Sequence, residues 1–331
     1  MDSPEVTVGI FSHNHSAYIQ DCVNYLVVAC NSPCNVIFID DASSDSTPSQ
    51  IRYAQTYLED RGWNTQVFLG ETNKYFPARL NQFLEMIDTE WFLVHSADDF
   101  LLPGAIDKLL KTARYFPNVD IVFGRILTVD LAGNPLPRPR RARMMMSKIG
   151  QIYSKPQYPF RDLLKYGNFI PGGLTLIRRV PAIGNVPLYR SMRNAEDFDW
   201  YLRLGRKSLA LMVNSEVGCW RVVPNSKSRA AGREYTESLL DIMNEQLRDA
   251  HPSDVKFIQD AAIRYWIRPF VCRDFKRCVG WRSLKSLPTI TGLVVLRRLP
   301  VILIREIMLL TSIYGGSRYT RSTVQAISSD E

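Results

Sequence analysis

The chain has 331 residues, of which 46% are hydrophobic and 22% are charged, and its formal net charge is +8. This composition supports a buried core and excludes an intrinsically disordered or collagen-like chain. The length exceeds that of an ordinary single domain without requiring two full domains. We therefore expect one large α/β domain with an appendage.

The positive charge is concentrated near the C-terminus. Residues 251–331 contain 13 Lys and Arg against 6 Asp and Glu, a surplus of +7. Such a region predicts an anionic neighbour such as a membrane surface. The apolar segment 287–314 is interrupted by Arg297, Arg298 and Pro300, so it is too short to span a bilayer. It is expected either to lie in the membrane interface or to pack as ordinary helices.

The six cysteines show no zinc-site spacing, and the N-terminus carries no secretory signal. We therefore expect a cytoplasmic protein with small, buried, unreactive cysteines, which could attach peripherally to the inner face of the membrane. No nucleic-acid-binding module is recognisable, so nucleic acid is not an expected partner.

Short β-rich runs alternate with helical stretches, which predicts a mostly parallel sheet with crossover helices. Residues 130–159 lose this periodicity and carry clustered arginines, so they are expected to form a mobile loop, either solvated or acting as a lid over a phosphorylated ligand. After residue 229 the chain is expected to be helical. The expected strands are 6–11, 35–40, 66–70, 91–96, 120–126, 172–179 and 209–215, and the expected helices before residue 229 are 17–30, 47–58, 77–86, 103–116 and 197–205.

Adjacent acids follow two of the expected strands, Asp40 with Asp41 and Asp98 with Asp99. In open α/β sheets, ligands bind at the carboxyl ends of the strands. Two acids that close an apolar strand are costly unless a cation or ligand pairs with them. Carboxylate oxygens suit Mg²⁺ or Mn²⁺, which also bind substrate phosphates.

These motifs resemble those of the family 2 glycosyltransferases, in matching order from residue 6 to residue 228. The resemblance implies a GT-A fold, which is a mixed, mostly parallel sheet flanked by helices, over residues 1–230. Residues 231–331 would form a basic, largely helical C-terminal region that could associate with the membrane. The motifs that carry the resemblance are SHN (12–14), DDASSDST (40–47), ETNKYFPARLN (71–81), ADD (97–99), NFIPGGLTLIRR (168–179), RNAEDFDWYLRL (193–204) and WRVVPNSKS (220–228).

The resemblance also implies the site of a nucleotide-sugar donor. Asp41 would bind the nucleobase, usually uracil, because a carboxylate can accept the imide N–H. Asp99 would bind Mn²⁺ or Mg²⁺, and Asp98 would hold the ribose or assist the metal. The remaining donor-binding residues would be Ser12, Asn14 and Arg79, the last of which would face the nucleotide and its diphosphate.

On the acceptor side, the resemblance makes Asp197 the general base of a single in-line displacement that inverts the anomeric carbon. Glu196 would orient this base or touch the acceptor. Gly172 and Gly173 would let the backbone approach the acceptor sugar, although a tight turn would also explain them. The expected reaction is transfer of one sugar to a glycan or lipid-linked acceptor in surface polysaccharide synthesis.

Two departures from the family pattern bear on the metal. Ser96 stands where many relatives have an aspartate, and Val223 stands where a histidine completes the metal shell in some of them. A catalytically silent nucleotide-sugar-binding protein is one alternative. A sugar nucleotidyltransferase is another, but it needs a glycine-rich loop that residues 11–16 lack.

Overall fold

The computed structural model describes residues 4–184, 195–223 and 232–271. The chain divides into two compact units. The first contains Met1–Pro137 and Met146–Ser226, and the second contains Arg138–Met145 and Lys227–Glu331. Every candidate site residue named above belongs to the first unit.

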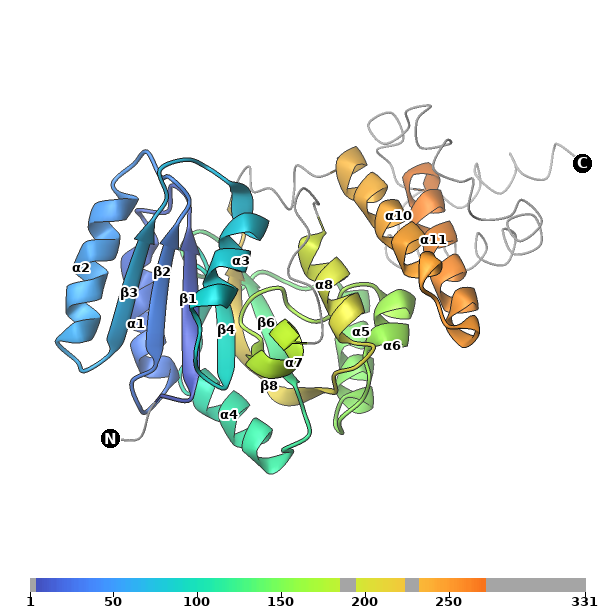
Figure 1. Ribbon diagram of the computed structural model, residues 1–331, viewed down its shortest axis with the longest axis horizontal. Helices are drawn as coiled ribbons and strands as arrows, with labels where there is room; N and C mark the ends of the chain where they lie inside the picture. The colour runs from blue at the N-terminus through green and yellow to red at the C-terminus, as the bar shows by residue number, and fades with distance from the viewer. Residues whose placement is uncertain (1–3, 185–194, 224–231, 272–331) are drawn as a thin grey trace, which may run out of the picture. The chain divides into compact units, whose positions relative to one another are not determined.

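Eight described strands of the first unit form one mixed sheet (Figure 1). They are β1 (Val6–Ser12), β2 (Asn35–Asp40), β3 (Asn64–Leu69), β4 (Trp91–Ser96), β5 (Phe100–Leu101), β6 (Ile121–Val129), β7 (Leu176–Arg178) and β8 (Ala210–Arg221). The helices that accompany them are α1 (Ile19–Ala29), α2 (Thr47–Glu59), α3 (Tyr75–Met86), α4 (Ala105–Tyr115), α5 (Arg140–Ile152), α6 (Phe160–Tyr166), α7 (Arg179–Gly184) and α8 (Glu196–Leu204).

The strand order is β3-β2-β1-β4-β7-β6-β8-β5. The first four of these strands are parallel, whereas β7 pairs antiparallel with both β4 and β6. The chain moves from β1 outward to β2 and β3, then returns through α3 to β4 on the other side of β1. The reversal between β1 and β4 is a topological switch point, where open α/β sheets bind ligands.

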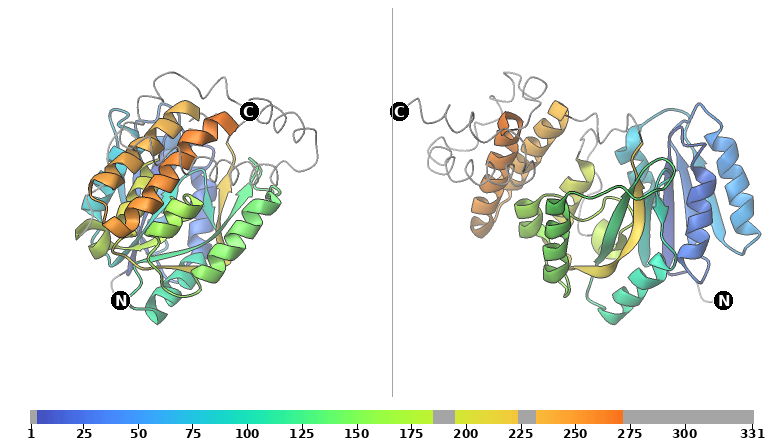
Figure 2. Two further views of the ribbon diagram at one scale, coloured as in Figure 1. Left: turned by 90° about the vertical axis from the view of Figure 1, so that its right-hand side faces the viewer. Right: turned by 180° about the vertical axis from the view of Figure 1, so that it is seen from behind.

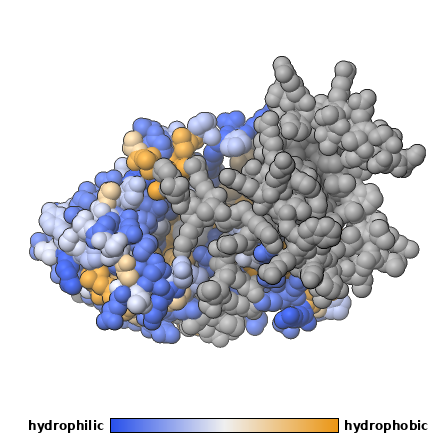
Figure 3. All heavy atoms as spheres, turned by 90° about the horizontal axis from the view of Figure 1, so that it is seen from above, coloured by the Kyte–Doolittle hydropathy of each residue, from blue (hydrophilic) through white to orange (hydrophobic). Residues whose placement is uncertain are grey.

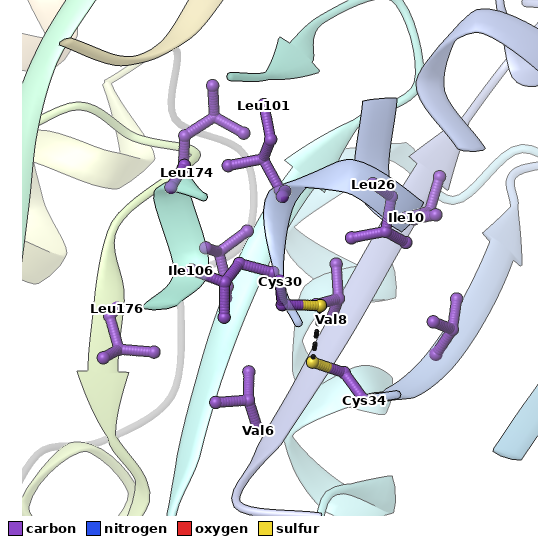
Figure 4. Close-up of a cluster of buried hydrophobic side chains, with 14 of the residues drawn as sticks. Val6, Val8, Ile10, Leu26, Cys30, Cys34, Leu101, Ile106, Leu174 and Leu176 are labelled. Carbon is purple, nitrogen blue, oxygen red and sulfur yellow. Dashed lines mark hydrogen bonds between the residues drawn. The ribbon is translucent and has the colours of Figure 1, made fainter. Parts of the chain in front are cut away.

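Apolar side chains on both faces hold this sheet between helices. All residues of β1 are buried, as expected for a parallel strand that is covered on both sides. Val6, Val8 and Ile10 belong to a core cluster with residues of α1, α2 and α4 (Figure 4). In that cluster the Sγ atoms of Cys30 and Cys34 lie 3.5 Å apart, and the four described cysteines are free and buried.

The opposite face is covered by α3 and α8, so the first unit has helix, sheet and helix layers (Figures 1 and 2). Phe92 of β4 links the two helices, because its ring centroid lies 5.9 Å from that of Phe83 in α3 and 6.2 Å from that of Trp200 in α8. The surface described in Figure 3 is mostly hydrophilic, with small separate apolar patches.

The structure agrees with the strands predicted at 35–40 and 91–96, and it corrects the prediction for residues 130–159. That segment is not a loop throughout, because it contains α5. Arg, Ala, Met and Lys are good helix formers, and Ile149 on this helix is buried. The strand predicted at 172–179 is shorter, and the one at 209–215 continues to Arg221. Asn214, Ser215 and Glu216, in the middle of β8, hid this continuation.

In the second unit, α10 (Gly232–Arg248) and α11 (Pro252–Val271) pack against each other. Among the residues that the structure describes, none of the helices is long and apolar enough to span a membrane. The basic tail beyond residue 271 and the apolar segment 287–314 lie outside the described residues. Their proposed contact with a membrane stays a prediction.

The packing of β1 against α3 predicts a stability effect at Gly9. A Cβ atom there would lie 2.6 Å from a ring carbon of Phe83. We expect Gly9→Ala to lower the free energy of unfolding by about 1–3 kcal/mol, because overpacking displaces the aromatic ring. Gly150→Ala in α5 is the control, since the nearest atom would lie 3.8 Å away. Urea denaturation measures both, and equal stability of the two variants would contradict this packing.

Candidate active site

The loops that follow β1, β2 and β4 meet at one edge of the sheet. The backbone N–H of Asp41 donates to the carbonyl of Ser12, and that of Ala97 donates to the carbonyl of Phe11, both at 2.9 Å. The end of β1 is therefore hydrogen-bonded to both acidic loops. This brings the Asp40–Asp41 and Asp98–Asp99 pairs to either side of the switch point.

The two acids that follow β2 have different surroundings. Asp40 is 1% exposed and accepts hydrogen bonds from Ser12 Oγ at 2.9 Å and from the Ser43 N–H at 2.8 Å. It therefore ties its own loop to β1. The hydroxyl of Ser12, a predicted donor-binding group, is used in this internal bond.

Asp41 is held by a buried arginine. Its Oδ1 atom accepts from Arg79 Nε at 2.7 Å and from the backbone N–H of Lys74 at 2.8 Å. All of the side-chain hydrogen bonds described for Asp41 fall on Oδ1, which leaves Oδ2 to accept from a ligand. Arg79 is 2% exposed and also donates to Gln82 and to the carbonyl of Thr72. This geometry gives Arg79 a positioning role toward Asp41 and keeps its guanidinium away from the surface.

Among the residues that the structure describes, four other than glycine have a left-handed backbone, and all lie in the loops around this edge or at the start of α3. They are Asn14, Ala42, Tyr75 and Leu174, with φ between 57° and 66°. Such strain concentrates at functional sites. Glycine adopts this conformation most readily, yet Ala42 and Tyr75 hold it here. Asn14 joins two loops, because its Oδ1 atom accepts from the Ser44 N–H at 2.8 Å.

The acids that follow β4 lie close together. Ser96 Oγ donates to Asp98 Oδ1, so the serine that replaces the family's aspartate holds its neighbour. Asp99 Oδ1 accepts from the backbone N–H of Arg221, the last residue of β8, at 3.0 Å. Burial, followed by the charge of Asp98, raises the pKa of Asp99 to about 8.

These carboxylates could supply only part of a metal site. Within the described ranges, no group of three or more His, Cys, Asp and Glu residues could hold a metal ion. Mg²⁺ commonly takes one or two carboxylates and completes its shell with water and substrate phosphates. Asp98 and Asp99 fit that pattern. Val223, two residues beyond Arg221, offers no ligand atom.

Asp197 lies near the N-terminus of α8 and is held by two donors. Its Oδ2 atom accepts from Asn168 Nδ2 and its Oδ1 atom from the Phe198 N–H, both at 2.7 Å. Burial raises the pKa of Asp197, while both hydrogen bonds lower it. Its side chain makes no ion pair with any described residue. Glu196 precedes it as the first residue of α8.

The glycine pair connects Asp197 with β4. A Cβ atom on Gly172 would lie 2.8 Å from Asp197 Oδ2, and one on Gly173 would lie 3.2 Å from the carbonyl oxygen of Val94. The N–H of Leu174 donates to the same carbonyl at 2.8 Å. The loop that contacts Asp197 is thus hydrogen-bonded to the strand that ends before Asp98 and Asp99.

Three residues of the quoted motifs for which the sequence predicted no individual role also belong to this region. His13 is exposed, and its Nδ1 atom lies 2.9 Å from the carbonyl oxygen of Asp41. Asn168 orients Asp197, and its buried Oδ1 atom has no hydrogen-bond partner among the described residues. The backbone N–H of Arg221 binds Asp99, as given above. The motifs SHN, NFIPGGLTLIRR and WRVVPNSKS mark the three positions, but the motifs alone do not give their contacts.

Comparisons with known proteins identify a family and several proteins that this chain resembles. The model of the family described as glycosyl transferase family 2 matches residues 7–182. Uncharacterized proteins of Mycobacterium tuberculosis and Mycobacterium bovis are 26% identical over 201 residues. This match covers 58% of the chain, and the chain spans about half (51%) of the length of these curated relatives.

Two solved structures are similar over nearly the whole chain. Residues 1–349 of TarS from S. aureus, in complex with UDP-GlcNAc, match with a TM-score of 0.65 at 14% identity, over 96% of this chain and 93% of that one. The mannosyltransferase PcManGT from Pyrobaculum calidifontis, in complex with GDP-Man and Mn²⁺, gives 0.59 at 15% identity, over 96% and 89%. At these identities the likeness shows the fold alone, which is the expected GT-A fold.

The left-handed backbone of Ala42 predicts that Ala42→Gly stabilises the protein. An L-residue in this conformation costs roughly 1–2 kcal/mol, while glycine loses roughly 0.5–1 kcal/mol in entropy. We expect a net gain of about 0.5–1 kcal/mol in the free energy of unfolding. The control Ala78→Gly, inside α3, should lose about 1 kcal/mol. Chemical denaturation tests both, and a loss of stability in Ala42→Gly would refute the assigned backbone strain.

Proposed function

The chain belongs to glycosyl transferase family 2 and is a glycosyltransferase, and from this premise we propose that it transfers one sugar from a UDP-sugar with inversion. The acceptor is a hydroxyl group of a glycan or lipid-linked molecule, and the product contributes to surface polysaccharide. The observation that carries the proposal is the hydrogen bonding of both acidic loops to the end of β1. The similar structures support a nucleotide-sugar donor, since one holds UDP-GlcNAc and the other GDP-Man.

In this proposal the nucleobase lies against Asp41. The carboxylate accepts the imide N–H of uracil through Oδ2, while the hydrogen bonds to Oδ1 from Arg79 and Lys74 fix its orientation. Ser12 and Asn14 shape the adjacent loop. Guanine also presents an N–H beside a carbonyl, so a GDP-sugar is the donor that the experiment must distinguish.

Asp99 and Asp98 are the proposed ligands of Mn²⁺ or Mg²⁺, together with diphosphate oxygens of the donor. A metal bound there would stabilise the negative charge that develops on the nucleoside diphosphate as it leaves. Support comes from the raised pKa of Asp99, which is caused by burial and then by the charge of Asp98, because two neighbouring carboxylates favour a bound cation. The similar mannosyltransferase structure contains Mn²⁺.

Asp197 is the proposed general base, which removes the proton from the acceptor hydroxyl during attack on the anomeric carbon. Burial raises its pKa toward the pH at which a base is efficient, and Asn168 keeps the carboxylate oriented. Glu196, Gly172 and Gly173 line the acceptor side. The N-terminal catalytic domain would comprise residues 1–230, and residues 231–331 would contact the anionic inner face of the membrane from the cytoplasm.

The donor prediction can be tested by calorimetric binding of UDP-, GDP-, dTDP- and CMP-sugars, with and without Mn²⁺. We expect one nucleoside diphosphate sugar to bind more tightly with the metal. Asp99→Ala should abolish this enhancement, because it removes a metal ligand. The variant Asp130→Ala, in the loop that follows β6, is the control and should bind the donor like the wild type. If none of these sugars binds, the proposed donor site is wrong.

The base prediction concerns turnover, followed as release of the nucleoside diphosphate. Asp197→Asn should lower kcat by about 10²–10⁴-fold while donor affinity is kept, because general base catalysis is lost. Asp130→Asn is the matched control. Unchanged turnover in Asp197→Asn would exclude this residue as the base.

A pH profile of kcat/KM separates the role of Asn168 from a purely structural one. Activity should fall in acid as Asp197 takes up a proton, with an apparent pKa above the ordinary value for aspartate. Asn168→Ala removes a hydrogen bond that favours the ionised carboxylate, so the acid limb should move to higher pH. An acid limb that stays in place would show that Asn168 does not act on the base.

A further inference from the structure

Two buried nitrogen atoms near the Asp98–Asp99 pair have no hydrogen-bond partner among the described residues. They are Nε of Arg221, whose side chain is 5% exposed, and Nδ1 of His15. A buried donor without a partner costs about 1–3 kcal/mol, and more when it is charged. Such atoms in native proteins call for an explanation, and a ligand that completes the site is one.

Both nitrogen-bearing groups contact the ring of Tyr18. The guanidinium carbon of Arg221 lies 4.9 Å from the ring centroid, and the centroid of the His15 ring lies 6.0 Å from it, edge to face. Both groups also interact with the acidic pair. The charge of Arg221 lowers the pKa of Asp99, and the charge of Asp98 raises that of His15. The orphaned nitrogens therefore belong to one region beside the proposed metal ligands.

The guanidinium of Arg221 is only loosely neutralised. Its ion pair with Asp21 is 3.5 Å long, and the Asp21 side chain is 58% exposed. Pairs with a solvated partner are weak. The group also lies over the ring of Phe100, at 5.4 Å, so aromatic rings and not carboxylates provide much of its surroundings. A planar guanidinium held in this way is well suited to bind phosphate oxygens.

The charges of the site call for such a cation. Asp98 and Asp99 repel a diphosphate, and one divalent metal ion does no more than cancel the charge of these two carboxylates. Val223 adds no further ligand to the metal. Arg221 supplies a fixed positive charge next to Asp99. The backbone N–H of Arg221 donates a hydrogen bond to Asp99 Oδ1.

His15 contributes a hydrogen bond without a charge. Burial lowers the pKa of its imidazole, which favours the neutral ring. In the tautomer with its proton on Nδ1, the ring can donate one hydrogen bond to an anionic oxygen. Its backbone is fixed by the bond from its N–H to Thr47 Oγ1, at 2.8 Å.

We propose that Arg221 and His15 form an anion subsite that binds the diphosphate of the donor directly, so that part of diphosphate binding does not require a metal. The inference rests on the proposed function, because the donor is the molecule that brings the diphosphate to this edge of the sheet. Beyond that function, it assigns Arg221 and His15 to the diphosphate, and it makes part of the diphosphate affinity independent of the metal.

The test is titration calorimetry in EDTA with UDP, UMP and uridine, and with GDP, GMP and guanosine. The wild type should bind the matching diphosphate at least ten-fold more tightly than the nucleoside. Arg221→Met should lose this ten-fold advantage while nucleoside affinity stays unchanged, and His15→Ala should lose a few-fold of it. Arg221→Lys keeps the charge and should retain an intermediate advantage. Arg125→Met is the matched control, since Arg125 forms an ion pair with Glu216 at 3.0 Å.

Three outcomes would overturn the inference. Arg221→Met could bind the diphosphate as the wild type does, or it could lose nucleoside and diphosphate affinity equally, as expected for a packing role. The wild type could bind the diphosphate with Mn²⁺ but not in EDTA, which would leave the proposed function standing. A wild type that binds no nucleotide even with Mn²⁺ would instead refute the proposed function. If melting temperatures show that Arg221→Met is unfolded, Arg221→Lys takes its place. Its diphosphate affinity is then compared with its nucleoside affinity in the same way.

Discussion

The position at which β1 ends governs the geometry of the site. The carbonyls of Phe11 and Ser12 accept backbone hydrogen bonds from Ala97 and Asp41, each at 2.9 Å. Because β2 and β4 flank β1 in parallel, these two bonds fix both acidic loops at the reversal of strand order. The placement of the acids therefore relies on the buried backbone of the sheet and not on long side chains. This rigidity is what a preorganised catalytic site requires.

The carboxylates at this edge are satisfied to different degrees. Asp40 accepts hydrogen bonds from Ser12 and Ser43 within the protein. Asp41 accepts one from Arg79 on a single carboxylate oxygen. Asp99 has one backbone donor and a raised pKa, and the half-buried Asp197 relies on neutral donors. Burying a charge without full compensation is costly, so the protein must recover this cost elsewhere, in the apolar packing of the sheet. The incompletely satisfied groups are the ones that a metal, a diphosphate or an acceptor hydroxyl would complete.

Local sequence patterns predicted the sheet better than the contacts within the site. Continuous apolar runs identified β2 and β4 with their observed ends, since buried parallel strands have that signature. The pattern missed α5, because prolines precede this helix and clustered arginines stand at its start. It could not predict that Asn168 binds Asp197 or that Arg221 binds Asp99, because pairing between distant residues leaves no local trace. The left-handed backbone at Ala42 and Tyr75 was equally hidden, since neither residue is glycine.

The central claim is that acids from separate loops serve one nucleotide-sugar site at the carboxyl ends of β1, β2 and β4. A crystal structure of the protein with UDP and Mn²⁺ addresses this claim most directly. Our account predicts the uracil ring at Asp41, the metal ion on Asp99 and the diphosphate beside Arg221, with Asp197 facing the open side of the metal. A nucleotide bound elsewhere on the protein, or an Asp197 carboxylate turned away from the bound diphosphate, would contradict it.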